Sequence, residues 1–402
     1  MQRQRPGAAA GRRWWQAVGV GFALAYSSAC SLNQAWVPPE RALAAAPAPD
    51  SIDSTLLLIG DAGKPALDTP EPVLVALRDE ATRAPSRTVV VYLGDNIYEN
   101  GLAEPTDPDR ARGETVLRAQ ADVIQKSGAR GIFLPGNHDH HHDGRRAVRR
   151  QAQFITELSI PGLEFRPLDD CVGPESIDVG DRLRLVVFDS SWWIHDEFAA
   201  PAPACSVRSE KDFTTAMENA LASAGGRDVV VAAHHPIASH GWHGGFFTWD
   251  DHLFPLHRAV SWLWLPLPGV GSLYPLYRSQ GGVSQDIAST RYQNMLQDLE
   301  LAFHKHPPLA FAGGHDHNLQ VLRGRRGVRY VLVSGSGSIA RPDPVSRGDD
   351  TICVSPLAGF MRLDFFRDGR VRLEVVEVHA DGKVERPCAM WLGADVPTAP
   401  GP

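Results

Sequence analysis

The segment TVVVYLGDNIY, residues 88–98, is the clearest guide to the fold of this chain. Its β-branched apolar run is typical of a buried strand, and the polar motif Gly94-Asp95-Asn96-Ile97-Tyr98 begins where the run ends. In open α/β sheets, ligands bind beyond the carboxyl ends of the strands. We therefore expect Asp95 and Tyr98 to lie at a sheet edge and to belong to a binding site.

Four other segments repeat this arrangement of an apolar run followed by a short polar motif. The carboxyl ends of such strands meet at one edge of a sheet, so we expect the polar side chains to converge although they are far apart in sequence. The runs TLLLIG, GIFLP, DVVVAA and PLAFAG lead into Gly60-Asp61-Ala62-Gly63, Gly136-Asn137-His138-Asp139, His234-His235-Pro236 and Gly314-His315-Asp316-His317.

The residue types in these motifs favour a site for two metal ions. No set of thiolates suits a structural zinc, whereas carboxylate, amide, imidazole and phenolate groups suit harder or borderline metals. An aspartate at the end of a central strand can bridge two cations, which can clamp a phosphate and acidify a bound water. Each motif alone is weak, because such pairs occur by chance. All five in this order predict a two-metal hydrolase.

Length and composition fit one large enzyme domain. The chain has 402 residues, of which 43% are hydrophobic, as is ordinary for a globular protein with a sizeable core. A formal net charge of -7 argues against a nucleic-acid partner, because nucleic-acid binders usually carry a basic face. No internal repeat or linker divides the later chain, so we expect a single domain over residues 54–390 and a tail over residues 391–402.

Apolar spacing predicts helices and strands in alternation, which is typical of an α/β fold. We expect a layered sandwich with mixed β-sheets and helices outside. Near the C-terminus strands follow one another, and Asp368-Gly369 suits a hairpin turn. The expected helices span residues 71–82, 111–127, 149–158, 211–224 and 292–303, and the expected further strands span residues 183–189, 328–334, 360–366 and 370–378.

The N-terminal segment, residues 1–30, has the features of an export leader. An arginine-rich start precedes a mostly apolar stretch over residues 14–29 that is short for a membrane span. The sequence Ser27-Ser28-Ala29-Cys30 suggests lipoprotein cleavage with a lipid on Cys30, although leucine is usual where Ser27 stands. Ordinary signal cleavage and an uncleaved anchor are the alternatives. We expect a periplasmic or membrane-anchored lipoprotein, alternatively a secreted protein, with residues 31–53 as a mobile linker.

Four cysteines follow the leader: Cys171, Cys205, Cys353 and Cys388. None forms a C-x-x-C pair, so a zinc ribbon or redox dithiol is not expected. Two disulfides with three connectivities are compatible with this count, and the Cys171–Cys205 pair is favoured because the two residues flank one strand region. Free buried thiols are the alternative.

Residues 240–290 interrupt the alternation with many aromatic residues and several prolines. Proline breaks this segment too often for it to span a membrane. Because it directly follows a metal motif, we interpret it as a lid or substrate wall. The alternatives are a second hydrophobic patch packed on the domain and a contact with a membrane surface, since Trp and Tyr favour interfaces.

The five motifs resemble those of the calcineurin-like metallophosphoesterases, and within them the purple acid phosphatases. The family pattern GD-x-G, GD-x-x-Y, GNH-[DE], V-x-x-H, GH-x-H is present as GDAG, GDNIY, GNHD, VAAH and GHDH. The run GHDHNLQ, residues 314–320, is similar to that of the low-molecular-weight, animal-type enzymes. The resemblance covers roughly residues 54–378 and implies a four-layer α/β/β/α sandwich.

The resemblance also implies a ligand set. Gly63 stands where most of these enzymes have a histidine, and Tyr98 is the purple acid phosphatase exchange, in which a phenolate that favours Fe(III) replaces an imidazole. Asp95 would bridge Fe(III) and a divalent ion of Fe, Zn or Mn. The resemblance gives Asp61, Asp95, Tyr98 and His317 to the ferric ion, and Asp95, Asn137, His234 and His315 to the divalent ion.

Three further residues are expected in catalysis. His138 would bind phosphate or protonate the leaving group, and Asp139 would orient His138. The family has another pocket histidine after the fourth motif, for which we favour His240 over its competitor His243.

The expected activity is that of an acid phosphatase that hydrolyses phosphomonoesters with a metal-bound hydroxide, on a small phosphorylated substrate and without nucleic acid. A phosphodiesterase, nucleotidase or phospholipid-phosphate hydrolase of the same fold is the alternative, and a non-catalytic metal-binding or adhesion protein is a third. Lipidation of Cys30 would add a membrane as a partner.

Overall fold

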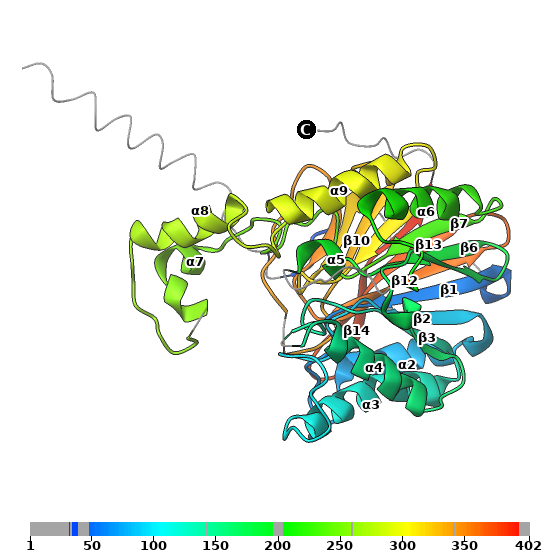
Figure 1. Ribbon diagram of the computed structural model, residues 1–402, viewed down its shortest axis with the longest axis horizontal. Helices are drawn as coiled ribbons and strands as arrows, with labels where there is room; N and C mark the ends of the chain where they lie inside the picture. The colour runs from blue at the N-terminus through cyan, green and yellow to red at the C-terminus, as the bar shows by residue number, and fades with distance from the viewer. Residues whose placement is uncertain are drawn as a thin grey trace, which may run out of the picture.

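The computed structural model describes residues 32, 34–38, 48–141, 143–195, 204–258, 260–340 and 342–393. Two mixed β-sheets of seven strands each pack face to face, and helices cover their outer faces (Figure 1). The result is a four-layer α/β/β/α sandwich, which confirms the expected fold class.

The first sheet has the strand order β14-β13-β12-β1-β2-β3-β4. Strands β1 to β4 are parallel to one another, and β12, β13 and β14 continue the sheet in antiparallel pairs. Helices α2, α3 and α4 cover its outer face. The bounds are β1 Ile52–Ile59, β2 Thr88–Tyr92, β3 Arg130–Phe133, β4 Leu163–Phe165, β12 Gly359–Phe366, β13 Val371–Val378, β14 Val384–Leu392, α2 Pro72–Thr82, α3 Arg110–Ser127 and α4 Arg145–Glu157.

The second sheet has the strand order β11-β9-β10-β8-β7-β6-β5. Its central strands β6, β7, β8 and β10 run parallel, and the strands at both edges are antiparallel. Helices α5, α6 and α9 pack on its outer face. The bounds are β5 Glu175–Val179, β6 Leu183–Val187, β7 Asp228–Ala232, β8 Ala310–Gly313, β9 Leu319–Arg323, β10 Tyr330–Ser334, β11 Thr351–Ser355, α5 Ser191–Ile194, α6 Glu210–Ala222 and α9 Thr290–Phe303.

The main core lies between the two sheets. Leu58 of β1, Val91 of β2 and Val230 of β7 are fully buried there. The strands β1, β2, β3, β7 and β8 carry the five apolar runs of the motifs, and both faces of each strand are covered, by the other sheet and by helices. This double burial explains why their sequences are continuously apolar rather than alternating.

The expected helices are all present, within a few residues of their expected ends. Helix α4 begins at Arg145, four residues before the expected start, because its first turn is basic and carries little apolar signal. The Asp368-Gly369 turn is confirmed: the Gly369 N–H donates to the Phe366 carbonyl, and Gly369 has a φ of 92°. Strands β4, β5, β9, β11 and β14 were not expected. In β14, Pro387 hides the strand pattern, and proline is tolerated because β14 is an edge strand.

Both termini differ from the expected linker and tail. Trp36 forms a β-bridge with Val354 of β11, and Val37 packs on the main core, so this part of the linker lies on the domain. Strand β14 continues to Leu392, past the expected start of the tail. The leader, residues 1–30 with Cys30, lies outside the described residues. Within the described part of the chain, no helix is long and apolar enough to cross a membrane.

Cys171 and Cys205 form a disulfide, which confirms the favoured pair. It joins the segment before β5 to the segment before α6. Cys353 and Cys388 are buried and lie outside this disulfide.

The segment 240–290 projects from the sandwich in Figure 1. It contains no strand among its described residues, and its short helical elements are joined by loops. They are α7 Trp249–Leu253, the 3-10 turns η4 Pro255–Arg258 and η5 Val270–Ser272, and α8 Leu273–Ser279.

Candidate metal centre

The first group of motif residues meets where β1, β2 and β8 end. The Tyr98 hydroxyl donates to Asp61 Oδ1 at 2.7 Å and lies 3.3 Å from His317 Nε2. His317 Nε2 is 3.4 Å from the same Asp61 oxygen. Three residues from three motifs therefore form one polar cluster, as the sequence predicts.

The second group centres on Asn137, at the end of β3. Its Oδ1 atom lies 2.9 Å from His234 Nε2 and 3.0 Å from His315 Nδ1. Asp95 adjoins this second group, because its Oδ1 lies 3.5 Å from His234 Nε2 and accepts the His138 backbone N–H at 2.9 Å. Potential ligand atoms of Asp61, Asp95 and His234 all lie within 4.8 Å of one another.

Gly63 is required by the close approach of the first two motifs. A Cβ atom at this position would lie 2.5 Å from the Asp95 carbonyl oxygen and 2.6 Å from the backbone of residues 96 and 97. The Gly63 N–H donates to that same carbonyl, and the Tyr98 N–H donates to the Gly63 carbonyl. The absence of a side chain at residue 63 lets the second motif pack against the first and brings Tyr98 close to Asp61.

The partners of the three motif imidazoles determine which nitrogen carries the proton. His234 Nδ1 lies 2.8 Å from the Leu93 carbonyl oxygen, and His315 Nε2 lies 2.9 Å from the Gln285 carbonyl oxygen. A carbonyl only accepts, so these nitrogens donate N–H. His317 Nδ1 lies 2.8 Å from Asp343 Oδ2 and donates in the same way. The other nitrogen of each ring, which faces the motif residues, is left to bind a cation.

The pKa shifts of the motif residues agree with a site for cations. Burial lowers the pKa of His315 well below its usual value, so this ring is neutral. Burial alone would raise the pKa of Asp95, but His234 and His138 outweigh it and hold that pKa below the usual range. Burial would lower the pKa of His317, but the bonds to Asp343 and Asp61 raise it to about 10. A cation at His317 would have to displace a proton.

The side-chain atoms that meet in this cluster are suitable ligands for a metal ion. Asn137 Oδ1 lies 3.0 Å from His315 Nδ1, which the neutral tautomer of this ring leaves as a lone pair, and two acceptors facing one another in a buried site are unfavourable without a positive charge between them. Carboxylate, amide, imidazole and phenol groups are ligands for hard or borderline ions. The residues present therefore fit a metal group.

His138 lies at the edge of this cluster. Its Nδ1 lies 2.7 Å from the Glu99 carbonyl oxygen, so Nδ1 donates, and its Nε2 lies 4.0 Å from Asp95 Oδ2. Asp139 does not orient this imidazole, contrary to the expectation. The buried Asp139 carboxylate instead accepts N–H groups from Gly136, Asn96 and Gln151, which joins the second and third motif loops. Burial and the nearby Asp95 raise the pKa of Asp139 to about 6.

The structure corrects the choice of His240 as the further pocket histidine. His240 Nε2 pairs with Asp350 at 2.6 Å, and His240 lines a different cavity. His243 lines the motif cavity, and its ring centroid lies 3.9 Å from that of His315. The reason is a turn at residues 241–246, in which Gly244 and Phe246 both donate N–H to the Gly241 carbonyl and bring His243 back over the site.

The segment 240–290 supplies one wall of the motif cavity, which has a volume of about 400 Å³. Trp242, His243, Tyr274 and Arg278 line this wall together with Gln285. The Arg278 guanidinium pairs with Asp286, whose Oδ1 also lies 2.9 Å from His243 Nδ1. These contacts agree with the expectation that residues 240–290 form a wall of the substrate site.

Several residues of the site carried no sequence signal. Gln285, Asp286 and Asp343 lie in loops without a motif, and they act through the imidazoles of other residues. Only the spatial neighbourhood identifies them.

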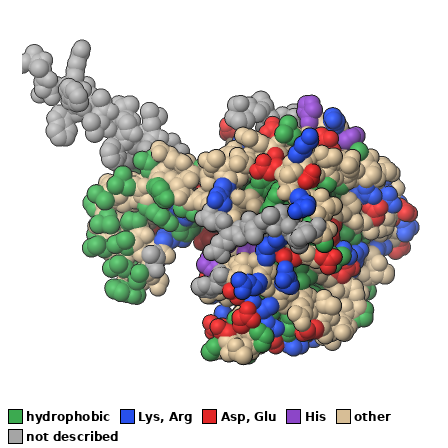
Figure 2. Space-filling model, viewed as in Figure 1, with side chains coloured by type: hydrophobic (Ala, Val, Ile, Leu, Met, Phe, Trp, Pro, Cys, Tyr) green, Lys and Arg blue, Asp and Glu red, His purple; other side chains and the backbone are tan. Residues whose placement is uncertain are grey.

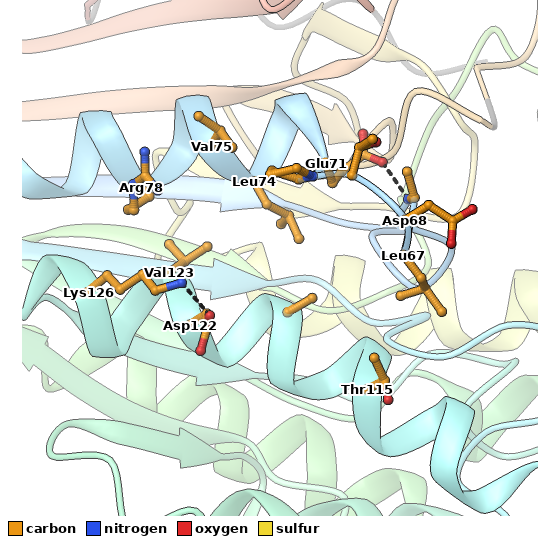
Figure 3. Close-up of a pocket in the computed structure, with 14 residues that line it drawn as sticks. Leu67, Asp68, Glu71, Leu74, Val75, Arg78, Thr115, Asp122, Val123 and Lys126 are labelled. Atoms are coloured by element: carbon orange, nitrogen blue, oxygen red, sulfur yellow. Dashed lines mark hydrogen bonds and ion pairs between the residues drawn. The ribbon is translucent and has the colours of Figure 1, made fainter.

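A second groove, of about 360 Å³, lies between α2 and α3 and is separate from the motif cavity (Figure 3). Leu67, Leu74 and Val123 line it, and the Asp122–Lys126 ion pair lies on its α3 side. It contains none of the five motifs, so we assign no chemistry to it.

Comparison with known proteins shows which proteins this chain is similar to. No family model matches the chain. Purple acid phosphatase 17 of Arabidopsis thaliana is 23% identical over 296 residues, which cover 73% of this chain and 69% of the relative. Purple acid phosphatase PPD1 from yellow lupin (Lupinus luteus) seeds has a similar structure, with a TM-score of 0.52 and 15% identity, and the match covers 84% of this chain and 53% of the lupin chain. PhoD has a TM-score of 0.46 at 12% identity, with 84% of this chain and 68% of PhoD covered. The chain is therefore similar to purple acid phosphatases in sequence and in fold.

Proposed function

We propose that this protein is an acid phosphatase that hydrolyses phosphomonoesters at a binuclear metal centre. The observation that carries the proposal is the convergence of seven motif side chains whose imidazoles all donate their outer N–H to a fixed acceptor. This arrangement leaves the inner nitrogens and oxygens to cations. The likeness to a purple acid phosphatase supports a phosphoesterase in particular.

The ligand assignment follows the two groups in the site. Asp61, Tyr98 and His317 would hold Fe(III), Asn137, His234 and His315 would hold a divalent ion, and Asp95 would be shared. Such a pair of ions polarises a phosphate ester and acidifies a water molecule. The Tyr98 hydroxyl already donates to Asp61, so its proton would leave when the phenolate binds a ferric ion.

His138 is the proposed proton donor to the leaving group. Its Nδ1 is occupied by the Glu99 carbonyl, so Nε2 is the nitrogen that exchanges a proton with substrate. His138 is partly exposed at the cavity wall, where a leaving alcohol has a way out to solvent. These two features favour a general acid over a purely structural residue.

His243 is the proposed second contact to substrate. Its Nδ1 is paired with Asp286, which leaves Nε2 for a phosphate oxygen. Because Asp286 also pairs with Arg278, the histidine and the wall of the cavity are held as one unit.

We also propose export, with cleavage near Cys30 and either a lipid anchor or release. The basic and apolar leader supports this proposal, and the Cys171–Cys205 disulfide agrees with an oxidising compartment.

The deciding experiment combines metal replacement with a pair of substrates. The chain would be stripped of metal with a chelator, reloaded with iron and a divalent ion, and assayed on an aryl phosphomonoester and an aryl phosphodiester. We expect turnover only after reloading, and faster turnover of the monoester. A faster diester would favour the phosphodiesterase alternative. If the reloaded protein turned over neither ester, the hydrolase proposal would be wrong.

A further inference from the structure

The segment over residues 249–277, which we name the apolar lobe, exposes most of the large hydrophobic side chains found on the surface. Fourteen large hydrophobic residues are exposed among the described residues, and eleven of them lie in the lobe. Figure 2 shows them as a continuous hydrophobic surface over α7 and α8. Exposed apolar patches of this kind mark sites of interaction. They are Trp249, Leu256, Val260, Trp262, Trp264, Leu265, Val270, Leu273, Tyr274, Leu276 and Tyr277.

The tip of the lobe carries no charge. Residues 259–277 contain no Asp, Glu, Lys, Arg or His, and Arg258 and Arg278 stand at the two ends of this stretch. A protein–protein interface has a polar rim around its apolar core. An uncharged surface with Trp262, which is 76% exposed, and with further Trp and Tyr residues is instead typical of side chains at a lipid interface.

The base of the lobe is fixed to the domain by its charged residues. The guanidinium groups of Arg258 and Arg278 lie 3.8 and 4.6 Å from the ring centroid of Trp242. Arg258 pairs with Asp251 at 2.6 Å, and Arg278 pairs with Asp286. All four of these charged side chains are therefore paired at the base of the lobe, and the part of the chain that carries α7 and α8 projects from the sandwich (Figure 1).

The N-terminal segment enters the domain beside the lobe. The Leu32 N–H donates to the Val345 carbonyl at 3.2 Å. The next residue, Ser346, lines a cavity of about 590 Å³ together with His252 and Leu276 of the lobe. Leu32, which follows the expected cleavage site at Cys30 by two residues, therefore lies on the side of the molecule that carries the lobe. A membrane reached through a lipid on Cys30 would meet the lobe as well.

We propose that the apolar lobe docks on a lipid bilayer, with its uncharged tip in the interfacial layer. The bilayer is the occupant favoured by the missing charges, by the exposed Trp and Tyr residues and by the neighbouring position of Leu32, close to the expected lipid site at Cys30. The proposal does not depend on the phosphatase activity. Helix α8 belongs both to the lobe and to the wall of the motif cavity, so docking would hold that cavity close to the lipid surface.

Fluorescence quenching of the full-length chain tests this proposal. The probe is a vesicle of phosphatidylcholine and phosphatidylglycerol with brominated acyl chains, which quench tryptophans that enter the bilayer. The matched variants are Leu273→Asp in the lobe and Leu301→Asp on α9, because these side chains are 61% and 63% exposed. The N-terminal segment is the same in every variant, so a difference between variants reports the lobe.

We expect Leu301→Asp to be quenched like the wild type, and Leu273→Asp to lose the part of the quenching that comes from the lobe. The double variant Trp262→Phe, Trp264→Phe should lose the same part, without adding a charge. Equal quenching of all four proteins would overturn the proposal. The same result would follow if a second copy of the chain covered the tip, because the lobe tryptophans would then stay out of the lipid.

Discussion

The Tyr98 hydroxyl donates a 2.7 Å hydrogen bond to the Asp61 carboxylate, although the two residues end different strands of the first sheet. This contact depends on Gly63, because the backbone of the second motif fills the space that a side chain at residue 63 would occupy. Tyr98 therefore reaches the carboxylate directly, where a phenolate and a carboxylate would share one ferric ion.

Tyr98→Phe should remove the visible colour of the iron-loaded protein while preserving the fold. A phenolate bound to Fe(III) absorbs visible light by charge transfer, and the phenylalanine variant cannot form that bond. Tyr92→Phe is the control, because Tyr92 is equally buried and its hydroxyl bonds the Gln120 carbonyl away from the site. An absorption spectrum after iron loading gives the answer. A colourless wild type that holds two zinc ions and no iron would contradict the ferric assignment.

Asp95→Ala should abolish turnover and lower the metal content. Asp95 is the carboxylate that both ions are proposed to share, and it lies close to both Asp61 and His234, so its loss should free both ions. Asn137→Ala should have the same effect on one ion. Metal analysis and kcat are measured together, with Asp122→Ala on the surface of α3 as the control. Wild-type activity in Asp95→Ala would rule out the two-metal interpretation.

His243→Ala should lower kcat/KM by on the order of 10²-fold, which is typical of the loss of one contact to the transition state, whereas His240→Ala should leave it near the wild-type value. The two residues form a matched pair. Each side chain is 23% exposed and pairs with a buried aspartate that also has an arginine partner. Both variants should lose a similar free energy of unfolding, of about 1–3 kcal/mol. If His240→Ala lost activity and His243→Ala did not, our correction of the pocket histidine would fail.

His138→Ala should lower kcat by roughly 10²–10⁴, the usual range for a general acid or base. The loss should be smaller for an aryl phosphate than for an alkyl phosphate, because the aryl leaving group needs less protonation. Steady-state rates on both esters are the measurement. Equal losses on the two esters would mean that His138 binds phosphate and does not donate the proton.

The mature protein should begin near Cys30 when the chain is expressed with its leader in an exporting host. The arginine-rich start and the apolar stretch over residues 14–29 motivate this expectation. Mass spectrometry of the N-terminus determines the cleavage site and any attached lipid. Cys30→Ser should prevent lipidation but not folding. A soluble cytoplasmic protein that begins at Met1 would contradict export.

The local sequence was sufficient for the layered fold and for the five motifs. A strand that is buried on both faces must be apolar throughout, so β1, β2, β3, β7 and β8 are visible as apolar runs. The polar motif residues are visible as well, because each motif begins directly after the carboxyl end of one of these strands. Edge elements carry weaker patterns, and for this reason β14, with Pro387 in it, was missed while the neighbouring β13 was found.

Only the tertiary structure decided which residues surround the motif side chains. His240 and His243 are equivalent in the sequence, and the turn at residues 241–246 directs one to Asp350 and the other to His315. The acceptors that set the imidazole tautomers, such as Asp343, come from loops whose path depends on long-range packing. The exposure of the lobe is a further case, because an apolar run looks the same in sequence whether the fold buries it or leaves it in solvent, and only packing against a neighbour distinguishes the two.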